Sequence, residues 1–210
     1  MSLFEQQLRE ETPRSLKALR EAENACRRCG LYKFATQAVP GEGPAHAPLM
    51  LIGEQPGNDE DIVGHPFVGP AGRMLDKALQ QAGIDRKQVF VTNAVKHFKH
   101  EMRGKRRLHK RPDPGEIEAC RWWNKIERDL VQPNLMVALG ATAARSVFER
   151  VITINKVRGR VLPVPDGGNA LVTIHPSYLL RLQEERDKEM EYTRFIEDLQ
   201  VARHFLRHAD

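Results

Sequence analysis

The sequence contains only three cysteines among its 210 residues. An odd number this low excludes a disulfide framework, so we expect the thiols to be free, redox-active or metal-binding. No apolar run approaches the ~20 residues that a membrane-spanning helix needs. The first residues, MSLFEQQLREE, are polar and acidic, unlike the basic and then apolar start of a signal peptide. We therefore expect a cytoplasmic protein.

Two common nucleotide-binding motifs are also missing. The glycine-rich segment from Gly53 to Gly57, GEQPG, lacks the GKS or GKT ending of a P-loop and the GxGxxG pattern of a dinucleotide-binding fold. This argues against binding of nucleoside triphosphates or NAD. The glycines and the proline still favour a tight turn with exposed backbone N–H groups, an arrangement often found around phosphates.

The chain is 40% hydrophobic, enough for one substantial core but short for two domains of ordinary size. Short β-rich runs alternate with segments of helical composition. This order predicts a parallel sheet of about four strands with helices on both faces, a three-layer α/β/α domain over residues 1–210. The predicted strands are residues 49–52, 89–93, 134–139 and 170–174.

Helix signals fall between these runs. The pair Thr12-Pro13 is an N-cap with a first-turn proline, which predicts a helix as far as Cys29. Further helices are predicted to begin at Pro70 and at Asp113-Pro114. The last helix is predicted over residues 188–208 as an amphipathic closing element.

Positive charge is concentrated in one segment. Residues 96–111 carry eight Lys or Arg and one Glu, whereas the whole chain has a net charge of +5. A basic patch of this kind is typical of a protein that binds a polyanion such as nucleic acid. A solvated basic loop without a partner is the alternative that composition leaves open.

Distinctive polar residues follow the predicted strands directly. They are GEQPG, Asn93 and the motif His175-Pro176-Ser177. Because the carboxyl ends of parallel strands meet at one edge of a sheet, we expect these residues to converge on one crevice. His175 is either a satisfied structural histidine or a donor of a hydrogen bond to a leaving group.

Two residues after GEQPG have a structural and a functional interpretation. Asp61 ends the acidic triplet Asp59 to Asp61, which is either a solvated turn or part of the site. Phe67, within HPFVGPAG, is either a core residue or a pocket wall on which a flipped base stacks. The residues alone leave both alternatives open.

Cysteine spacing indicates a metal site. Cys26 and Cys29 have the C-x2-C spacing of a metal chelate, and Cys120 lies far along the chain. His97 follows the second predicted strand and completes a Cys3His set suited to zinc or an iron–sulfur cluster. A redox pair like that of thioredoxin is the alternative, but that motif opens a helix, whereas this pair closes one.

Several motifs together resemble one enzyme group. GEQPG, HPFVGPAG, VTNAVKHF, KRRLH and HPS are similar to motifs of the UdgX group of uracil-DNA glycosylases, relatives of the family-four iron–sulfur enzymes. The resemblance covers most of the chain and implies the uracil-DNA glycosylase fold. It also implies a four-iron four-sulfur cluster, with zinc as the alternative, held by Cys26, Cys29, His97 and Cys120. Family-four enzymes have cysteine where this chain has His97.

The resemblance implies how uracil is removed. Phe67 would stack on uracil, Asn93 would read its amide edge, and His175 would donate to the charge developing on a carbonyl oxygen. Gln55 and Asp61 would position the pocket. The expected partner is uracil-containing, single-stranded DNA, and the protein is expected to be a monomer.

The KRRLH motif adds a candidate nucleophile. A neutral imidazole at His109 close to a cationic sugar carbon is a competent nucleophile, and Glu54 would orient it and stabilise the imidazolium. The protein would then stay bonded to the abasic strand after one turnover. An ordinary multiple-turnover glycosylase and a non-enzymatic, metal-containing nucleic-acid-binding module remain alternatives. The residues expected to contact DNA are Lys105, Arg106, Arg107 and Ser177.

Overall fold

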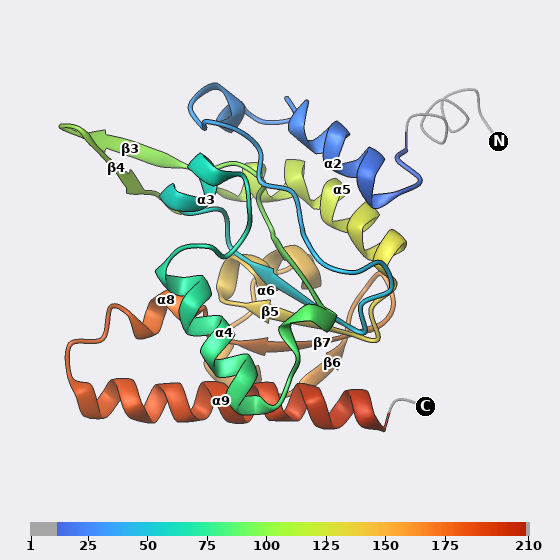
Figure 1. The fold of residues 1–210 in the computed structure, drawn as a ribbon, viewed down its shortest axis with the longest axis vertical. Coiled ribbons are helices and arrows are strands. Elements are labelled where there is room, and N and C mark those ends of the chain that lie inside the picture. The colour runs from blue at the N-terminus through green and yellow to red at the C-terminus, as the bar shows by residue number, and fades with distance from the viewer. Residues whose placement is uncertain (1–11, 209–210) are drawn as a thin grey trace.

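The computed structural model describes residues 12–208, which fold around a five-stranded sheet (Figure 1). Its strands are β1 (Leu49–Gly53), β2 (Val89–Asn93), β5 (Leu135–Leu139), β6 (Val161–Pro163) and β7 (Asn169–Thr173). Their order in the sheet is β2-β1-β5-β7-β6. The first four strands are parallel, and β6 pairs antiparallel with β7 at the edge.

This sheet confirms the predicted α/β class and its core of four parallel strands. The sequence does not predict β6, because a run of two partly buried residues and the exposed Pro163 is too short to show a strand pattern. Proline is tolerated there because β6 lies at the edge of the sheet, where a missing N–H leaves no partner unpaired.

A second sheet consists of two strands only. β3 (His100–Arg103) pairs antiparallel with β4 (Arg106–His109), and this hairpin extends away from the body of the protein (Figure 1). Gly104 in its turn has a φ of 60°, which glycine adopts without strain. The segment expected as a basic loop is therefore largely β4. We call residues 100–109 the basic hairpin.

Helices cover both faces of the central sheet. One face packs against α4 (Pro70–Ala82) and α9 (Glu185–Arg207), and the other against α6 (Ala141–Phe148) and the end of α5 (Pro114–Val131). α2 (Leu16–Asn24) packs on α5. No helix within residues 12–208 is both long and apolar enough to cross a membrane. The short helices are α3 (Asn58–Val63), α7 (Ile154–Val157), α8 (Pro176–Leu179) and the 3-10 turns Gly30–Lys33 and Arg86–Gln88.

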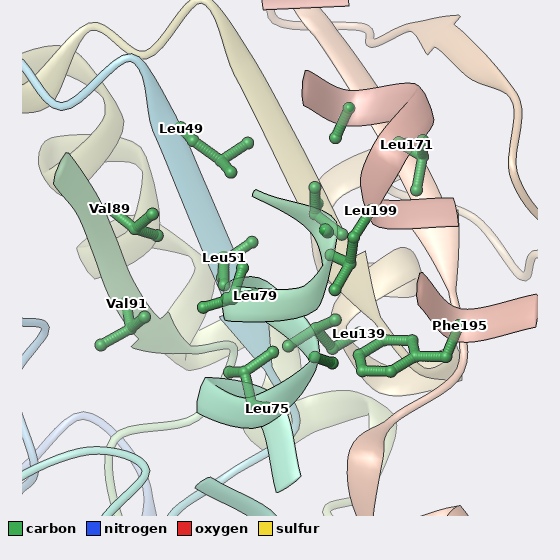
Figure 2. Close-up of a cluster of buried hydrophobic side chains, with 14 of the residues drawn as sticks. Leu49, Leu51, Leu75, Leu79, Val89, Val91, Leu139, Leu171, Phe195 and Leu199 are labelled. Carbon is green, nitrogen blue, oxygen red and sulfur yellow. The ribbon is translucent and has the colours of Figure 1, made fainter. Parts of the chain in front are cut away.

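Alternate residues of the parallel strands point to opposite faces. Leu49 and Leu51 face the side covered by α4 and α9, in the same cluster as Leu79 of α4 and Phe195 of α9 (Figure 2). Met50 and Ile52 face the side covered by α6. Every residue of β1, β2 and β5 is buried, as parallel strands covered on both faces require. This packing holds the strand ends, and therefore the loops that follow them, in place.

The N-terminal helix is shorter than the sequence predicts. The prediction ran from Thr12 to Cys29, whereas α2 covers only the middle of that range. Ser15 is the N-cap, because its hydroxyl accepts a hydrogen bond of 3.2 Å from the N–H of Ala18. The chain leaves the helix before Cys26, so the cysteine pair lies in the turn that follows α2.

The other predicted helix starts are confirmed. α4 begins at Pro70, and α5 begins after Asp113, whose carboxylate accepts from the N–H of Glu116. The Glu116 side chain accepts in return from the N–H of Asp113, which completes a capping box. These caps determine where the chain turns into each helix after it leaves the sheet.

Candidate active site

A cavity of about 1220 Å³ opens at the carboxyl ends of the parallel strands. β2 and β5 flank β1 on opposite sides, so the order of the strands along the chain reverses direction at β1. A crevice at such a reversal is the usual ligand site of a parallel α/β sheet. The structure brings seven predicted site residues to its wall: Glu54, Gln55, Phe67, Asn93, His109, His175 and Ser177.

His109 and Glu54 form a pair on this wall. His109 Nε2 lies 3.2 Å from Glu54 Oε1, and Thr142 Oγ1 donates to Glu54 Oε2 over 2.7 Å. Burial raises the pKa of Glu54, but the hydrogen bonds with His109 and Thr142 outweigh it and leave the pKa below its ordinary value. The pair is therefore a carboxylate held against a half-exposed imidazole.

Gln55 joins the two ends of the basic hairpin. Its Nε2 donates to the carbonyl oxygens of Lys99 and Lys110 over 3.1 and 3.0 Å, and its Oε1 accepts from the N–H of Lys99 over 3.0 Å. All the hydrogen-bonding groups of this amide except one oxygen lone pair are then used. Gln55 thus positions the strand end that carries His109.

Asp61 does not line the cavity. It is completely buried, accepts a hydrogen bond of 3.0 Å from the N–H of Thr36, and pairs with Arg107. Arg107 also donates to Asn58 and packs over the ring of Phe98. Asp61 therefore anchors the basic hairpin, and Arg107 is held by the protein rather than directed into the cavity.

Phe67 and Asn93 meet at Gly53. A Cβ atom on Gly53 would lie 2.3 Å from Asn93 Oδ1 and 2.7 Å from Phe67 Cζ, so only glycine allows both side chains to approach. Phe67 has a φ of 58°, which is uncommon for an aromatic residue. Gly72 of α4 lies so close that a Cβ there would be 1.7 Å from the Phe67 carbonyl oxygen. The surroundings hold the ring and the amide in place.

His175 is held in one tautomer. The backbone N–H of Ser177 donates to its Nδ1 over 3.2 Å, and the Ser177 hydroxyl lies 2.8 Å from the same nitrogen. Since Nδ1 accepts, a neutral ring carries its proton on Nε2. Burial lowers the pKa of His175 to about 4, although the nearby Glu54 carboxylate opposes this. At neutral pH the residue is therefore an uncharged donor.

Three of the four predicted DNA contacts, Lys105, Arg106 and Arg107, lie outside the cavity. Lys105 and Arg106 are exposed at the turn of the basic hairpin, whereas Arg107 is partly buried. Ser177 lines the cavity and is bonded to His175. The structure thus divides the predicted DNA contacts into two exposed cations and two anchored side chains.

The three cysteines lie together between α2 and α5. Cys26 and Cys120 are buried in one cluster, and Cys29 packs against it. Trp123 Nε1 donates to Cys26 Sγ over 3.1 Å, and the N–H of Lys96 donates to Cys120 Sγ over 3.2 Å. Hydrogen bonds to sulfur are a feature of cysteine ligands in iron–sulfur sites.

His97 is buried, and its Nδ1 has no hydrogen-bond partner in the part of the chain that the structure describes. Burial lowers the pKa of His97, which keeps the ring neutral, as a metal ligand must be. Within residues 12–208, no group of three His, Cys, Asp or Glu side chains is arranged in this conformation so that it could hold a metal ion. The donor set nevertheless fits a metal chemically, with three thiols beside N–H donors and one unpartnered imidazole nitrogen.

Sequence reasoning missed two polar residues of the site. Thr142, which bonds Glu54, follows β5 by three positions, so the rule that polar residues after strands converge could have found it. Arg111 lines the cavity, and its Nε lies 3.4 Å from Thr142 Oγ1. The cavity also continues to Asn155 and Arg158, which no motif marks.

The fold and the cavity define an α/β protein with a histidine–carboxylate pair at the reversal point of its sheet. The profile of the "Uracil DNA glycosylase superfamily" matches residues 40–200. The chain therefore belongs to the uracil-DNA glycosylase superfamily.

Individual relatives cover most of the chain. A type-4 uracil-DNA glycosylase of Thermotoga maritima is 34% identical over 193 residues, 91% of this chain and 95% of that protein. One of Archaeoglobus fulgidus is 34% identical over 177 residues, 80% of this chain and 85% of that protein. A type-5 uracil-DNA glycosylase of Thermus thermophilus is 28% identical over 163 residues, 69% of this chain and 71% of that protein.

Proposed function

We propose that this protein is a uracil-DNA glycosylase that cleaves uracil from deoxyribose and then remains bonded to the sugar through His109. The observation that carries the proposal is the pair of His109 and Glu54 on the wall that also contains Asn93 and His175. The names of the type-4 relatives support the reaction. GEQPG and KRRLH, which supply this pair, support assignment to the UdgX group.

Recognition of uracil requires the base to leave the stack and enter the cavity. The Phe67 ring, 6.2 Å from the His175 ring and inclined to it by 27°, offers a face for stacking. The carboxamide of Asn93 offers an N–H group that can donate to O4 of uracil and an oxygen that can accept from its N3–H group. Thymine shares that edge, so rejection of thymine has to come from steric exclusion of its methyl group.

Departure of uracil requires stabilisation of negative charge on the base. His175 meets this need as a neutral donor, because Ser177 holds Nδ1 as an acceptor and leaves the proton on Nε2. The bond between C1′ and N1 breaks, and its electron pair leaves with the base. The Nε2–H group donates to the carbonyl oxygen that carries the resulting charge.

The nucleophile is His109 Nε2. When the ring carries both protons, the proton on Nε2 moves to the Glu54 carboxylate 3.2 Å away, and the ring keeps its proton on Nδ1. The freed lone pair on Nε2 bonds to C1′ as uracil leaves, which generates an alkylated imidazolium. Glu54 then returns its proton to the uracil anion and, as a carboxylate again, stabilises the positive ring.

This sequence of steps ends in a stable product. An alkylated imidazole leaves C1′ slowly unless a positioned water attacks, and the His109 ring occupies the side from which such a water would come. The reaction is therefore a single turnover, with one strand bonded to each protein molecule. A multiple-turnover glycosylase is the second candidate, because the names of the relatives state a uracil-DNA glycosylase and no covalent product.

Denaturing electrophoresis tests the proposal. The protein is incubated with a labelled single strand that contains one uracil, and a matched strand with thymine is the control. We expect a denaturation-resistant, shifted band with uracil only. Free abasic strand without a shifted band would exclude the adduct and leave an ordinary glycosylase. Intact strand in every lane would overturn both, and DNA binding alone would then favour a non-enzymatic module.

We further infer that Cys26, Cys29, Cys120 and His97 hold a four-iron four-sulfur cluster. The three neighbouring thiols and the unpartnered His97 Nδ1 support this assignment. Bound in that position, the cluster would join the turn after α2 to α5 and to the end of β2 and stabilise the fold. Anaerobic purification should give about four irons per chain, and stoichiometric zinc without iron would refute the assignment.

A further inference from the structure

The end of β2 carries a buried charged network that the proposed reaction does not use. The side chain of Lys96 is completely buried, and its Nζ lies 2.7 Å from Glu127 Oε2 and 3.7 Å from Glu23 Oε1. The same Nζ donates to the carbonyl oxygen of Asn93 over 3.2 Å. Asn124 Nδ2 donates to that carbonyl over 3.0 Å and to Glu127 over 3.1 Å.

These donors replace a missing strand. β2 is an edge strand, and on its open side Val91 exchanges two backbone hydrogen bonds with Glu42. Backbone groups two residues apart face the same side of a strand, so the Asn93 carbonyl faces that open side too. No further strand of the described chain pairs there. The side chains of Lys96 and Asn124 supply the hydrogen bonds that a strand would otherwise provide.

The position of this backbone carbonyl determines the position of the Asn93 side-chain amide. On its inner side Asn93 lies against Gly53, where even one added carbon would be 2.3 Å from Asn93 Oδ1. The side-chain amide therefore has no room to move toward Gly53 if the backbone of Asn93 shifts. A displacement of the carbonyl would be passed on to the group that faces uracil.

Stability does not account for the choice of these residues. Burial of a lysine and its carboxylate partners carries a large desolvation cost, and apolar residues of similar volume often give equal or greater stability. An apolar residue at position 96 would, however, remove a donor from the Asn93 carbonyl. The network is therefore explained better by the geometry it imposes than by the stability it adds.

We propose that Lys96 and Asn124 are positioning residues for uracil recognition, which hold the backbone of Asn93 so that its amide meets the base. This inference rests on the proposed function and deepens it. On this proposal, recognition of uracil by Asn93 depends on two side chains that touch neither base nor sugar.

The test compares two variants with a matched control. Asn124→Ala removes one donor and leaves the ion pair, and Lys96→Met removes the other donor at similar volume. Thr92→Val is the control, because Thr92 Oγ1 bonds Lys96 and Glu127 in the same network but does not bond Asn93. Two quantities are measured for each full-length protein: inhibition of adduct formation by free uracil, and affinity for a strand that carries a tetrahydrofuran abasic analogue.

We expect free uracil to inhibit Asn124→Ala about tenfold more weakly than wild type, as loss of one buried hydrogen bond corresponds to roughly that factor. Lys96→Met should show at least the same loss. Affinity for the abasic analogue should be unchanged in both, because that strand has no base for Asn93 to bind. Thr92→Val should bind uracil like wild type.

Equal uracil inhibition in Asn124→Ala and wild type would overturn the inference, as would equal losses for uracil and for the abasic analogue. If Lys96→Met does not fold, which circular dichroism would reveal, Asn124→Ala decides the question alone. A wild-type protein that neither releases uracil nor responds to it would refute the proposed function itself. Normal wild-type chemistry with an unaffected Asn124→Ala would refute only the positioning role.

Discussion

The two histidines of the cavity have different kinds of support. His175 follows a central strand, packs near Phe67 and accepts a hydrogen bond from the backbone of Ser177. His109 lies at the end of the basic hairpin, half exposed, and the hairpin is attached to the body through Gln55 and through Arg107. One wall of the cavity is therefore part of the core, and the other is an attached element.

This difference separates recognition from covalent chemistry. The residues that would hold uracil depend on the packed ends of the sheet, where a small change in backbone position is not tolerated. The residue that would attack the sugar depends on three local anchors, the Gln55 amide, the Asp61–Arg107 pair and Glu54. Changes in the hairpin should therefore alter the product of the reaction without abolishing release of uracil.

The largest expected effect is that of His109→Ala. This variant should form no denaturation-resistant adduct, yet it should still release uracil with turnover, because water can enter the space beside C1′ with Glu54 available to position it. Electrophoresis and a free-uracil assay measure both products. His100→Ala is the matched control, since His100 pairs with His109 across the hairpin. An adduct with His109→Ala would disprove the assignment of the nucleophile.

A second variant disturbs the wall of the cavity that Phe67 and Asn93 form. Gly53→Ala places a carbon 2.3 Å from Asn93 Oδ1 and 2.7 Å from Phe67 Cζ, so one of these side chains must move. We expect uracil release to fall about a hundredfold, the usual consequence of a misplacement of about 1 Å in a site. Single-turnover rates at saturating DNA measure this. Gly115→Ala, in the first turn of α5, is the control for an alanine in place of glycine and should retain release, because the nearest atom to the added carbon is Asp113 Oδ1 at 3.4 Å.

A third prediction concerns how the free energy of unfolding depends on the protonation of His175. Burial lowers the pKa of His175 to about 4, whereas in the unfolded chain the pKa has its ordinary value of about 6.5. Between these values the unfolded chain binds more protons, so the free energy of unfolding should fall as the pH drops through this window. Urea unfolding at several pH values measures the slope. A slope unchanged by His175→Gln would contradict the prediction.

The smallest effect concerns DNA affinity and distinguishes neighbouring arginines. Arg106→Gln should lower the slope of log affinity against log salt by about one unit, because an exposed phosphate contact is lost. Arg107→Gln should leave this slope nearly unchanged but slow adduct formation, because it releases the hairpin from Asp61. Fluorescence anisotropy at several salt concentrations measures the slopes. Equal slopes for wild type and Arg106→Gln would show that Arg106 does not contact phosphate.

Much of the fold could be predicted because its signals are local. Apolar runs marked the four parallel strands, and Pro70 and Asp113 marked helix starts that the structure confirms. The predicted start of α2 is wrong because two residues that can cap a helix, Thr12 and Ser15, lie within one turn of each other and either is chemically suitable. Local patterns identify an element more securely than they identify its ends.

The sequence by itself determined the class of fold and the residues that gather at the cavity, since polar groups that follow parallel strands must meet at one edge. Only the tertiary structure decided which contacts the neighbouring polar and charged residues make. Gln55 bonds the backbone 44 and 55 positions away, Asp61 holds Arg107 46 positions away, and Lys96 meets Glu127 31 positions away. Such contacts leave no periodic trace in a single sequence, because they depend on packing between elements rather than on the order of residues within one.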